Sequence, residues 1–274
     1  MTEETFIGRG GTRLHMRSWL PAGVPRAVVV LVHGVNAHSG QQVWAGEQFA
    51  AAGFATYAYD HRGRGRSEGS PRFYIDDVSD YTDDLGTFVA LAKSRHPGLK
   101  VFLLGHSMGG VVSCYWSLDH QKEIAGFVCE SFAYRVPAPA LVLAIVRLLG
   151  KIAPQLPVLK LKMKDFTRDP QALAALEADQ LTLNEVQPAR TVAALLKAGD
   201  RMTAEFNTLK LPLLIMHGTA DKATMPAGSQ FFYDTATSTD KSIKLYQDHY
   251  HDLLNDLGKD KVLAEIVAWI NTRI

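Results

Sequence analysis

Apolar, β-branched runs alternate with amphipathic segments along the first half of the chain. Four runs are short enough for strands: Ala27 to Val32, Phe54 to Tyr59, Val101 to Leu104 and Ile124 to Cys129. Continuous apolar runs of this length are typical of strands buried on both faces of a parallel sheet. Segments with helical spacing lie between them, at 41–53 and 76–95, and end at glycine or at a Pro-Gly pair. The alternation predicts a mostly parallel α/β sheet flanked by helices.

The pattern changes at two places. Phe6 to Trp19 alternates around a Gly-Gly pair, which predicts a small hairpin. Residues 132–206 carry prolines, apolar helical pieces and a basic run but no convincing strand, so we expect an inserted helical cap. The core then resumes with strands at 211–216 and 242–246 and helices near 227–233 and over 252–274. The predicted organisation is a core built from 1–131 and 207–274, with a cap at 132–206.

The charge and the composition of the chain limit its expected binding partners and its expected location in the cell. The 274 residues carry a net charge of +1, without a long block of one sign. Nucleic-acid binding usually needs a basic patch, so we expect no RNA or DNA partner. The acidic, polar start lacks the basic and apolar regions of a signal peptide, which makes the cytoplasm the expected location. The longest apolar stretch, 136–150, is broken by prolines and Arg147 and falls short of the ~20 residues of a spanning helix, so it could lie on a membrane but not cross one.

Two cysteines, Cys114 and Cys129, are too few for a disulfide framework and lack the spacing of metal ligands. We expect both to be buried small hydrophobic residues. No metal or cofactor is predicted from the sequence.

The segment Gly105 to Gly109 breaks an apolar run and leads into a helix-compatible stretch. A glycine-flanked serine between a strand and a helix is the pattern of a nucleophile elbow. Such a turn would strain the backbone of Ser107, and the two flanking glycines would allow neighbouring backbone to approach closely. We expect Ser107 to be a nucleophile, with the Met108 N–H at the helix N-terminus stabilising a developing negative charge. A turn that uses small residues only for packing is the alternative.

A second oxyanion donor is expected from the loop after the 27–32 strand. His33-Gly34 brings the backbone close at this point, so the N–H of Val35 is the predicted donor. Together with Met108 it would form an oxyanion hole made of backbone groups.

A serine nucleophile also needs a base and an acid that orients the base. On a sheet of this topology both should follow the serine in chain order, with the acid first, in loops beyond strand carboxyl ends. Asp221, after the 211–216 strand, is the predicted acid. Glu130 is a rival acid, because its loop also opens towards the site, and a role of Asp221 in a turn or helix cap is the other alternative.

Two histidines compete for the role of base in the loop after the 242–246 strand. His251 directly precedes the predicted terminal helix, where a loop-to-helix junction can hold the ring firmly. His249 would point to the other side if the loop is extended. We therefore favour His251 over His249.

Taken together, these motifs resemble the α/β-hydrolases of the monoacylglycerol lipase and lysophospholipase-like group. The segments that carry the resemblance are 33–39, 60–67, 105–110, 217–221 and 250–251. The resemblance implies an α/β-hydrolase fold in which Ser107, Asp221 and His251 are nucleophile, acid and base. It also implies that Val35 and Met108 supply the oxyanion hole and that a carboxylic ester is hydrolysed through an acyl-enzyme.

The resemblance implies a structural role for the loop Asp60 to Ser67, whose three arginines would be surface or packing elements rather than a phosphate site. Two segments depart from the group. The loop from Val35 to His38 lacks the usual small residue, glycine and glutamate after His-Gly, and residues 132–206 do not align residue by residue with the group. Because the cap would form the acyl and alcohol pockets, substrate choice is the part that the resemblance supports least.

We expect a cofactor-free serine esterase or lipase acting on a small-molecule or lipid-like ester. A serine peptidase or amidase, a perhydrolase or acyltransferase on the same triad, and a non-catalytic binding module are the alternatives. A haloalkane or epoxide hydrolase is disfavoured, because those enzymes resemble this fold with aspartate at the elbow. The apolar run 140–149 and nearby Lys160, Lys162 and Lys164 suggest that the cap contacts a membrane or micelle, although a helix packed on the core with solvated lysines explains them equally well. The oligomeric state is not predicted.

Overall fold

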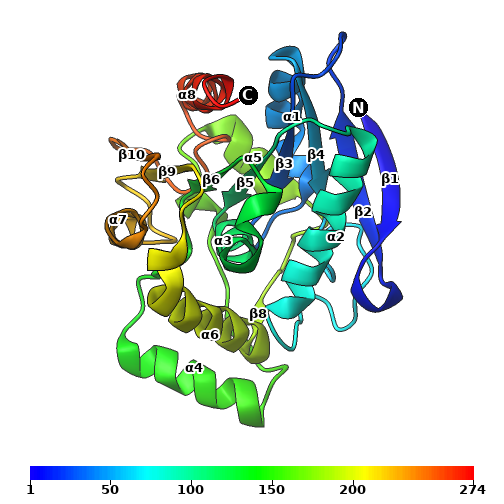
Figure 1. Cartoon of the computed structure of the whole chain (residues 1–274). Coiled ribbons are helices and arrows are strands. Elements are labelled where there is room, and N and C mark those ends of the chain that lie inside the picture. The colour runs from blue at the N-terminus through cyan, green and yellow to red at the C-terminus, as the bar shows by residue number, and fades with distance from the viewer.

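An eight-stranded sheet runs through the computed structural model, which describes residues 1–274 (Figure 1). The strands, in their order across the sheet, are β1 (Thr2–Ile7), β2 (Arg13–Trp19), β4 (Phe54–Tyr59), β3 (Ala27–Val32), β5 (Val101–His106), β6 (Gly126–Glu130), β9 (Leu213–Gly218) and β10 (Lys241–Tyr246). The β1–β2 hairpin is antiparallel and β2 is antiparallel to β4, whereas all pairs from β4 to β10 are parallel. The predicted hairpin and the mostly parallel sheet are confirmed.

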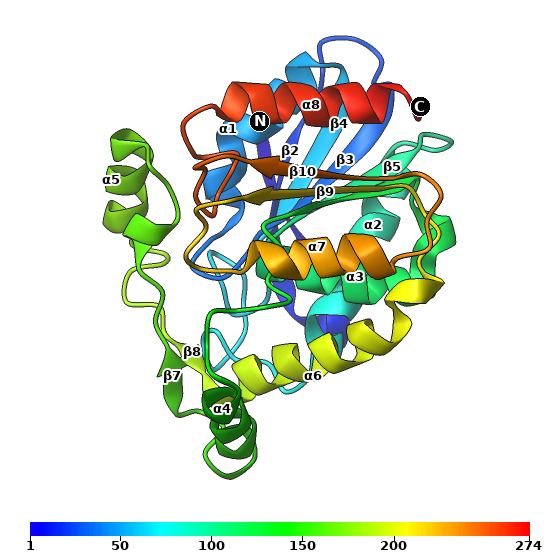
Figure 2. The same cartoon turned by 90° about the vertical axis from the view of Figure 1, so that its left-hand side faces the viewer.

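Helices cover both faces of this sheet, as Figures 1 and 2 show. The helices around the sheet are α1 (Val43–Ala51), α2 (Ser79–Arg95), α3 (Met108–His120), α7 (Pro226–Thr235) and α8 (Lys259–Asn271). Short 3-10 turns lie at η1 (Arg9–Gly11), η2 (Ser39–Gln42), η3 (Gln121–Glu123), η4 (Met163–Asp165) and η5 (Phe206–Thr208). None of the helices combines the length and the apolar character that crossing a bilayer requires.

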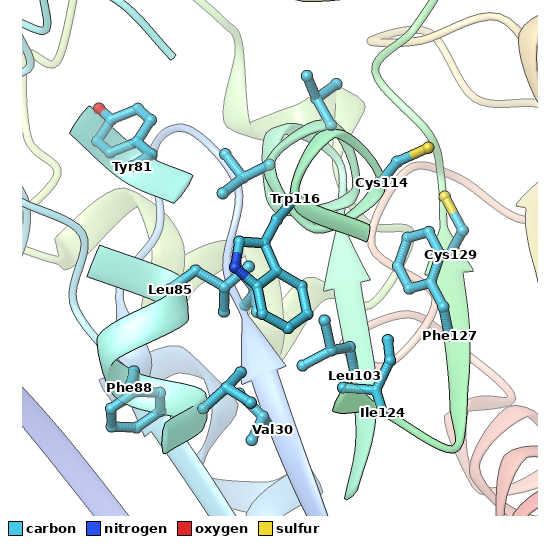
Figure 3. Packing of buried hydrophobic residues seen from close by; sticks show 14 of the residues in the cluster. Val30, Tyr81, Leu85, Phe88, Leu103, Cys114, Trp116, Ile124, Phe127 and Cys129 are labelled. Carbon is cyan, nitrogen blue, oxygen red and sulfur yellow. The ribbon is translucent and has the colours of Figure 1, made fainter. Parts of the chain in front are cut away.

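The apolar strands are buried on both faces because each face has its own layer of helices. Even-numbered residues of β3 belong to the larger apolar cluster with α2 and α3, and odd-numbered residues belong to the smaller cluster with α1 and α8. In the larger cluster Trp116 of α3 lies among Leu85 of α2 and the strand residue Leu103 (Figure 3). This two-sided burial accounts for the continuous rather than alternating pattern of the strands.

The two cysteines belong to the same larger cluster. Cys114 of α3 and Cys129 of β6 are both buried and unpaired (Figure 3). Burial raises the pKa of both thiols, so they stay protonated and unreactive at neutral pH. Their prediction as buried small hydrophobic residues is confirmed.

The segment between β6 and β9 stands outside the sheet (Figure 2). It contains α4 (Ala140–Ile152), β7 (Pro157–Leu159), α5 (Pro170–Ala178), β8 (Gln187–Pro188) and α6 (Ala189–Glu205). Helix α6 packs on α3 of the core and carries α4 on its outer side (Figure 1). The expectation of no strand here is wrong, because β7 and β8 form a small antiparallel pair. Strands this short and rich in proline leave no periodic pattern in the sequence.

The terminal helix is also shorter than the predicted 252–274. Helix α8 begins at Lys259, and turns occupy the chain from Asp252 to Gly258. Gly258 has a left-handed backbone (φ 88°), which separates these turns from the helix. His251 therefore lies in a loop well ahead of the helix, not directly before it.

Candidate active site

Ser107 occupies a sharp turn between β5 and α3. Its backbone angles, φ 55° and ψ −117°, are rare for a residue with a side chain, and such strain costs roughly 1–3 kcal/mol. A Cβ on Gly109 would collide with the Val32 carbonyl oxygen, and one on Gly105 would lie 2.6 Å from the Gly109 oxygen. The turn is thus possible only with glycine at both flanking positions. The Ser107 N–H donates to the Glu130 carbonyl at 2.9 Å, which fixes the turn to β6.

The loops after β9 and β10 bring Asp221 and His251 into direct contact. His251 Nδ1 lies 2.7 Å from Asp221 Oδ2, and both side chains are fully buried. Asp221 Oδ1 accepts the backbone N–H groups of Ala223 at 2.7 Å and of Thr224 at 2.9 Å. Its Oδ2 also accepts the Thr224 hydroxyl at 2.8 Å and lies 3.0 Å from His217 Nε2. The carboxylate is therefore held from several directions.

These partners decide the charge of Asp221. Burial alone would raise the pKa of this carboxyl, but His251 and His217 outweigh burial and hold the pKa well below its usual range. Asp221 is therefore ionised at neutral pH. An ionised acceptor at Nδ1 places the proton there and leaves His251 Nε2 as the basic nitrogen.

His251 is fixed on more than one side. Its ring meets the edge of Phe166 at 4.9 Å and the ring of His106 at 4.8 Å between centroids. Its Nε2 atom is buried and has no hydrogen-bond partner. Ser107 and His251 line the same cavity. The unpartnered nitrogen and the strained serine therefore border one space.

The rival residues occupy other positions. His249 is partly exposed, and its Nδ1 lies 3.0 Å from the backbone oxygen of Gln247. The Glu130 carboxylate accepts the N–H of Leu254 at 3.3 Å. Asp221 thus contacts His251 rather than His249, and Glu130 contacts the backbone rather than either ring.

The loop after β3 packs directly on the serine. A Cβ on Gly34 would lie 2.9 Å from Ser107 Cβ, so only glycine permits this approach. His33 Nδ1 donates to the Gly34 carbonyl at 2.7 Å, while its Nε2 accepts the His61 N–H at 3.0 Å. Burial lowers the pKa of His33 to about 3, so the ring stays neutral and locks the loop. Val35 then borders the cavity beside Ser107.

Met108 directly follows the serine and is the first residue of α3. The first N–H groups of a helix have no acceptor within the helix, and the helix dipole makes this end attractive to negative charge. Val35 and Met108, the two predicted donors, both line the cavity that Ser107 borders.

The cavity above Ser107 is apolar and has a volume of about 260 Å³. Its walls come mainly from residues 133–136, α4 and α6, and 14 of its 23 lining residues are hydrophobic. Arg147 and Asp200 also line it, and they pair with each other through two 2.8 Å bonds. A second apolar cavity of about 250 Å³ shares Leu143, Leu159 and Val192 with the first. Asp200 is the one carboxylate in the lining of the first cavity, and Arg147 compensates its charge.

The chain resembles known proteins over most of its length. The family described as serine aminopeptidase S33 matches residues 23–258. The chain belongs to this family of α/β-hydrolases. A monoacylglycerol lipase of Mycolicibacterium smegmatis is 36% identical over 272 residues, covering 98% of this chain and 96% of the relative. The human monoglyceride lipase is 28% identical over 98% of this chain and 90% of its own length.

Solved structures agree with this α/β-hydrolase assignment. The crystal structure of a Paleococcus ferrophilus monoacylglycerol lipase superposes with a TM-score of 0.84 at 28% identity, covering 95% of this chain and 99% of that one. A soluble variant of the Saccharomyces cerevisiae monoglyceride lipase, solved with a substrate analogue, gives a TM-score of 0.88 at 23% identity and covers 99% and 94% of the two chains. The latter likeness concerns the fold alone.

In this α/β-hydrolase, the arginine-rich loop after β4 is held by carboxylates. Arg62 pairs with Asp84, and Arg66 pairs with Glu3 on the surface. Arg64 is completely buried and pairs with Glu185. The pairing agrees with the structural role that the resemblance implied for this loop.

Three side chains near the site come close enough to share an ion. His106, Glu130 and Asp252 place nitrogen and oxygen atoms within 4.8 Å of one another. Because Glu130 already accepts a backbone N–H and Asp252 Oδ2 accepts the Asn255 amide at 3.0 Å, we assign no metal to this cluster.

Sequence reasoning missed several supports of the site. Thr224 contacts Asp221, Phe166 contacts His251, and Glu185 Oε1 accepts the Asn36 N–H at 2.9 Å. His217 lies four residues before Asp221 in a segment that carried the resemblance, but its bond to the acid was not foreseen. No sequence signal marks Phe166 or Glu185, because both contacts depend on the path of the chain between β6 and β9.

Proposed function

We propose that the protein is a serine ester hydrolase that cleaves monoacylglycerols or similar lipid monoesters with Ser107, Asp221 and His251 as its triad. One observation carries the proposal. The buried 2.7 Å contact between Asp221 and His251 leaves an unpartnered Nε2 on the same apolar cavity as the strained Ser107. Ester hydrolysis needs this combination of an oriented base and a presented nucleophile.

In the proposed reaction, His251 Nε2 removes the proton of Ser107 as the oxygen attacks the ester carbonyl. Asp221 holds the ring and stabilises the imidazolium that forms. The N–H groups of Val35 and Met108 bind the oxyanion, each worth roughly 3 kcal/mol in the transition state. His251 then protonates the leaving alcohol and activates a water that hydrolyses the acyl-enzyme.

The apolar cavity suits the acyl chain of such a substrate. We take residues 132–206 as a cap, because α4 and α6 form much of the wall above Ser107. Relatives that are named monoacylglycerol or monoglyceride lipases support the same substrate class. A glycerol monoester has one long apolar chain and a small polar head, so most of its surface would be buried in apolar walls.

An aminopeptidase, which the family description names, is the second candidate. It would need a carboxylate to bind the ammonium group of its substrate. Asp200 is the acidic residue among those lining the main cavity, and Arg147 already engages both of its oxygens. The apolar, charge-compensated lining therefore favours an ester over a free amino terminus.

The proposal is tested by comparing substrates. We expect release of fatty acid and glycerol from monoacylglycerols and turnover of p-nitrophenyl esters, with little or no cleavage of aminoacyl p-nitroanilides. Added peroxide or alcohol, followed by product analysis, would reveal a perhydrolase or acyltransferase. Faster turnover of the anilides than of any ester would refute the assignment.

Gly199 is expected to set the length of acyl chain that the cavity accepts. It lies inside α6, where glycine costs about 0.5–1 kcal/mol relative to alanine, and a Cβ there would meet only Tyr134, at 4.0 Å. Gly199→Leu should lower kcat/KM for C16 esters about tenfold or more relative to C4 esters, as a filled cavity excludes the chain end. Turnover of an ester series measures this ratio.

Gly199→Ala is the matched control for that series. It should keep the wild-type chain-length profile and raise the free energy of unfolding by about 0.5–1 kcal/mol. An equal loss at all chain lengths in Gly199→Leu would mean that the acyl chain does not reach α6.

We also propose that α4 docks the cap on a lipid surface. Leu141, Leu148 and Ile152 are 73%, 55% and 69% exposed on this helix, a pattern that leaves an apolar stripe unburied. Lys160, Lys162 and Lys164 follow in the chain and would favour an anionic surface.

Vesicle flotation tests this docking. The wild type should float with vesicles that contain anionic lipid, and the double substitution Leu141→Ser with Leu148→Ser should reduce the bound fraction about tenfold or more. Val24→Ser is the control, because Val24 is 90% exposed but lies in the loop before β3. Equal flotation of all three proteins, or none by the wild type, would remove the docking role.

A further inference from the structure

Glu130 is a buried carboxyl that the proposed reaction does not use. It is the last residue of β6 and is only 1% exposed. Two different parts of it reach the site from this position. The backbone carbonyl accepts the Ser107 N–H at 2.9 Å, and the side-chain Oε1 accepts the Leu254 N–H at 3.3 Å.

These two bonds link the nucleophile to the loop that carries the base. Leu254 lies three residues after His251, in the turns that precede α8, and the N–H of Leu253 faces the same carboxylate. The turns have no helix or strand of their own. Their position relative to the elbow therefore depends on bonds such as the one to Glu130.

The surroundings of this carboxyl make it unusually easy to protonate. Burial raises the pKa of Glu130 to about 7, an effect that His106 opposes and the Asp252 carboxylate increases. Tyr246 of β10 and the buried thiol of Cys129 also face it. His33 lines the same small cavity as Glu130 and is neutral.

We propose that Glu130 is a positioning residue. Its ionised carboxylate keeps the His251 loop aligned with Ser107, and this contact becomes weaker when the carboxylate is protonated. A carboxylate accepts an N–H about twice as strongly as a neutral oxygen does. Protonation near neutral pH thus weakens the bond to Leu254 without removing any group that touches substrate. The proposal rests on the function proposed above, since it concerns the alignment of the same serine and histidine.

The isosteric variant Glu130→Gln separates this role from ordinary packing. It keeps an oxygen for Leu254 but cannot ionise. The ratio of kcat in wild type to kcat in Glu130→Gln removes the pH effects that the two proteins have in common. We expect a ratio of about five at pH 8.5, falling towards one at pH 5.5, with KM for a short ester unchanged. A ratio that is constant across this range overturns the proposal.

Stability provides a second comparison between the same two proteins. Because the pKa of Glu130 is higher in the folded chain than the ordinary value of 4.5, the unfolded chain loses its proton first as pH rises. Wild type should therefore lose stability relative to Glu130→Gln between about pH 4.5 and about pH 7, and the difference should be constant above that range. The measurement is the difference in melting temperature between wild type and Glu130→Gln. If this difference is the same at pH 5 and at pH 8, the raised pKa of Glu130 is contradicted.

A measurement without any change at Glu130 keeps the proposal testable if that variant does not fold. The amide resonance of Leu254 should titrate with a midpoint near pH 7, and it should do so equally in Ser107→Ala. Titration in the inactive variant separates this inference from the catalytic assignment, which fails independently if Ser107→Ala retains activity. An amide resonance that does not move between pH 5.5 and pH 8.5 overturns the proposal.

Discussion

Ser107→Ala is expected to lower ester turnover by about a thousandfold or more and to abolish labelling by a fluorescent fluorophosphonate. The substitution removes the only hydroxyl on the elbow turn, so no acyl-enzyme can form. The oxyanion donors and the cavity would remain and account for any residual rate. Alanine has the same Cβ as serine, so the substitution does not increase the backbone strain of the turn at φ 55°.

Ser113→Ala is the control for this experiment. Ser113 lies on α3, is buried like Ser107, and its hydroxyl has no hydrogen-bond partner. Its removal should leave labelling and turnover at the wild-type level, because only an unsatisfied hydroxyl is lost. Labelling that persists in Ser107→Ala would assign the nucleophile to another residue and refute the proposed triad.

Asp221→Asn is expected to lower kcat by about a thousandfold to ten-thousandfold while the protein stays folded. The two backbone N–H groups of Ala223 and Thr224 bind Oδ1 and would keep the remaining amide oxygen in that place. The new NH₂ group would then face His251 Nδ1 and could only donate to it. The ring would be forced to carry its proton on Nε2, where it cannot accept the proton of Ser107.

Kinetics of the purified variant at pH 8 measure this loss, with circular dichroism as the check on folding. Asp248→Asn is the matched control, because Asp248 is an exposed aspartate in the loop after β10. It should retain wild-type kcat. A loss of less than about tenfold in Asp221→Asn would mean that another carboxylate orients the histidine.

Much of the sheet could be predicted because a parallel strand that is buried on both faces has a continuous apolar sequence. The strands at 27–32 and 54–59 have the predicted limits. The terminal helix could not be placed as well. Its predicted first residues, Asp252 to Gly258, form turns instead. Glu130 and other groups distant in sequence form hydrogen bonds with the backbone of these residues. The local sequence pattern does not reveal such distant partners.

The candidate site shows the same division. The elbow and the loop that supplies Asp221 have local signatures, a pair of glycines and an acid placed just beyond a strand, so the sequence could mark Ser107 and Asp221 as candidates. His251 is favoured over His249 partly for its place before a predicted helix, and this part of the reasoning is wrong because α8 begins only at Lys259. The ring is held instead by Asp221 and Phe166, which are distant in sequence.

The buried pair of Arg64 and Glu185 limits which segments of this enzyme can be exchanged with those of a relative. Glu185 lies between β6 and β9, Arg64 lies in the core, and both side chains are shielded from water. A chimaera in which residues 132–206 come from a relative would lose Glu185. Unless the donor segment places a carboxylate at the same position, the buried Arg64 charge would have no partner. An unpaired buried charge costs about 3–5 kcal/mol of stability. The same carboxylate binds the Asn36 N–H next to Val35, so a mismatched exchange would also disturb the loop beside Ser107. Exchanging the proposed cap for that of a relative therefore requires matching changes in the core.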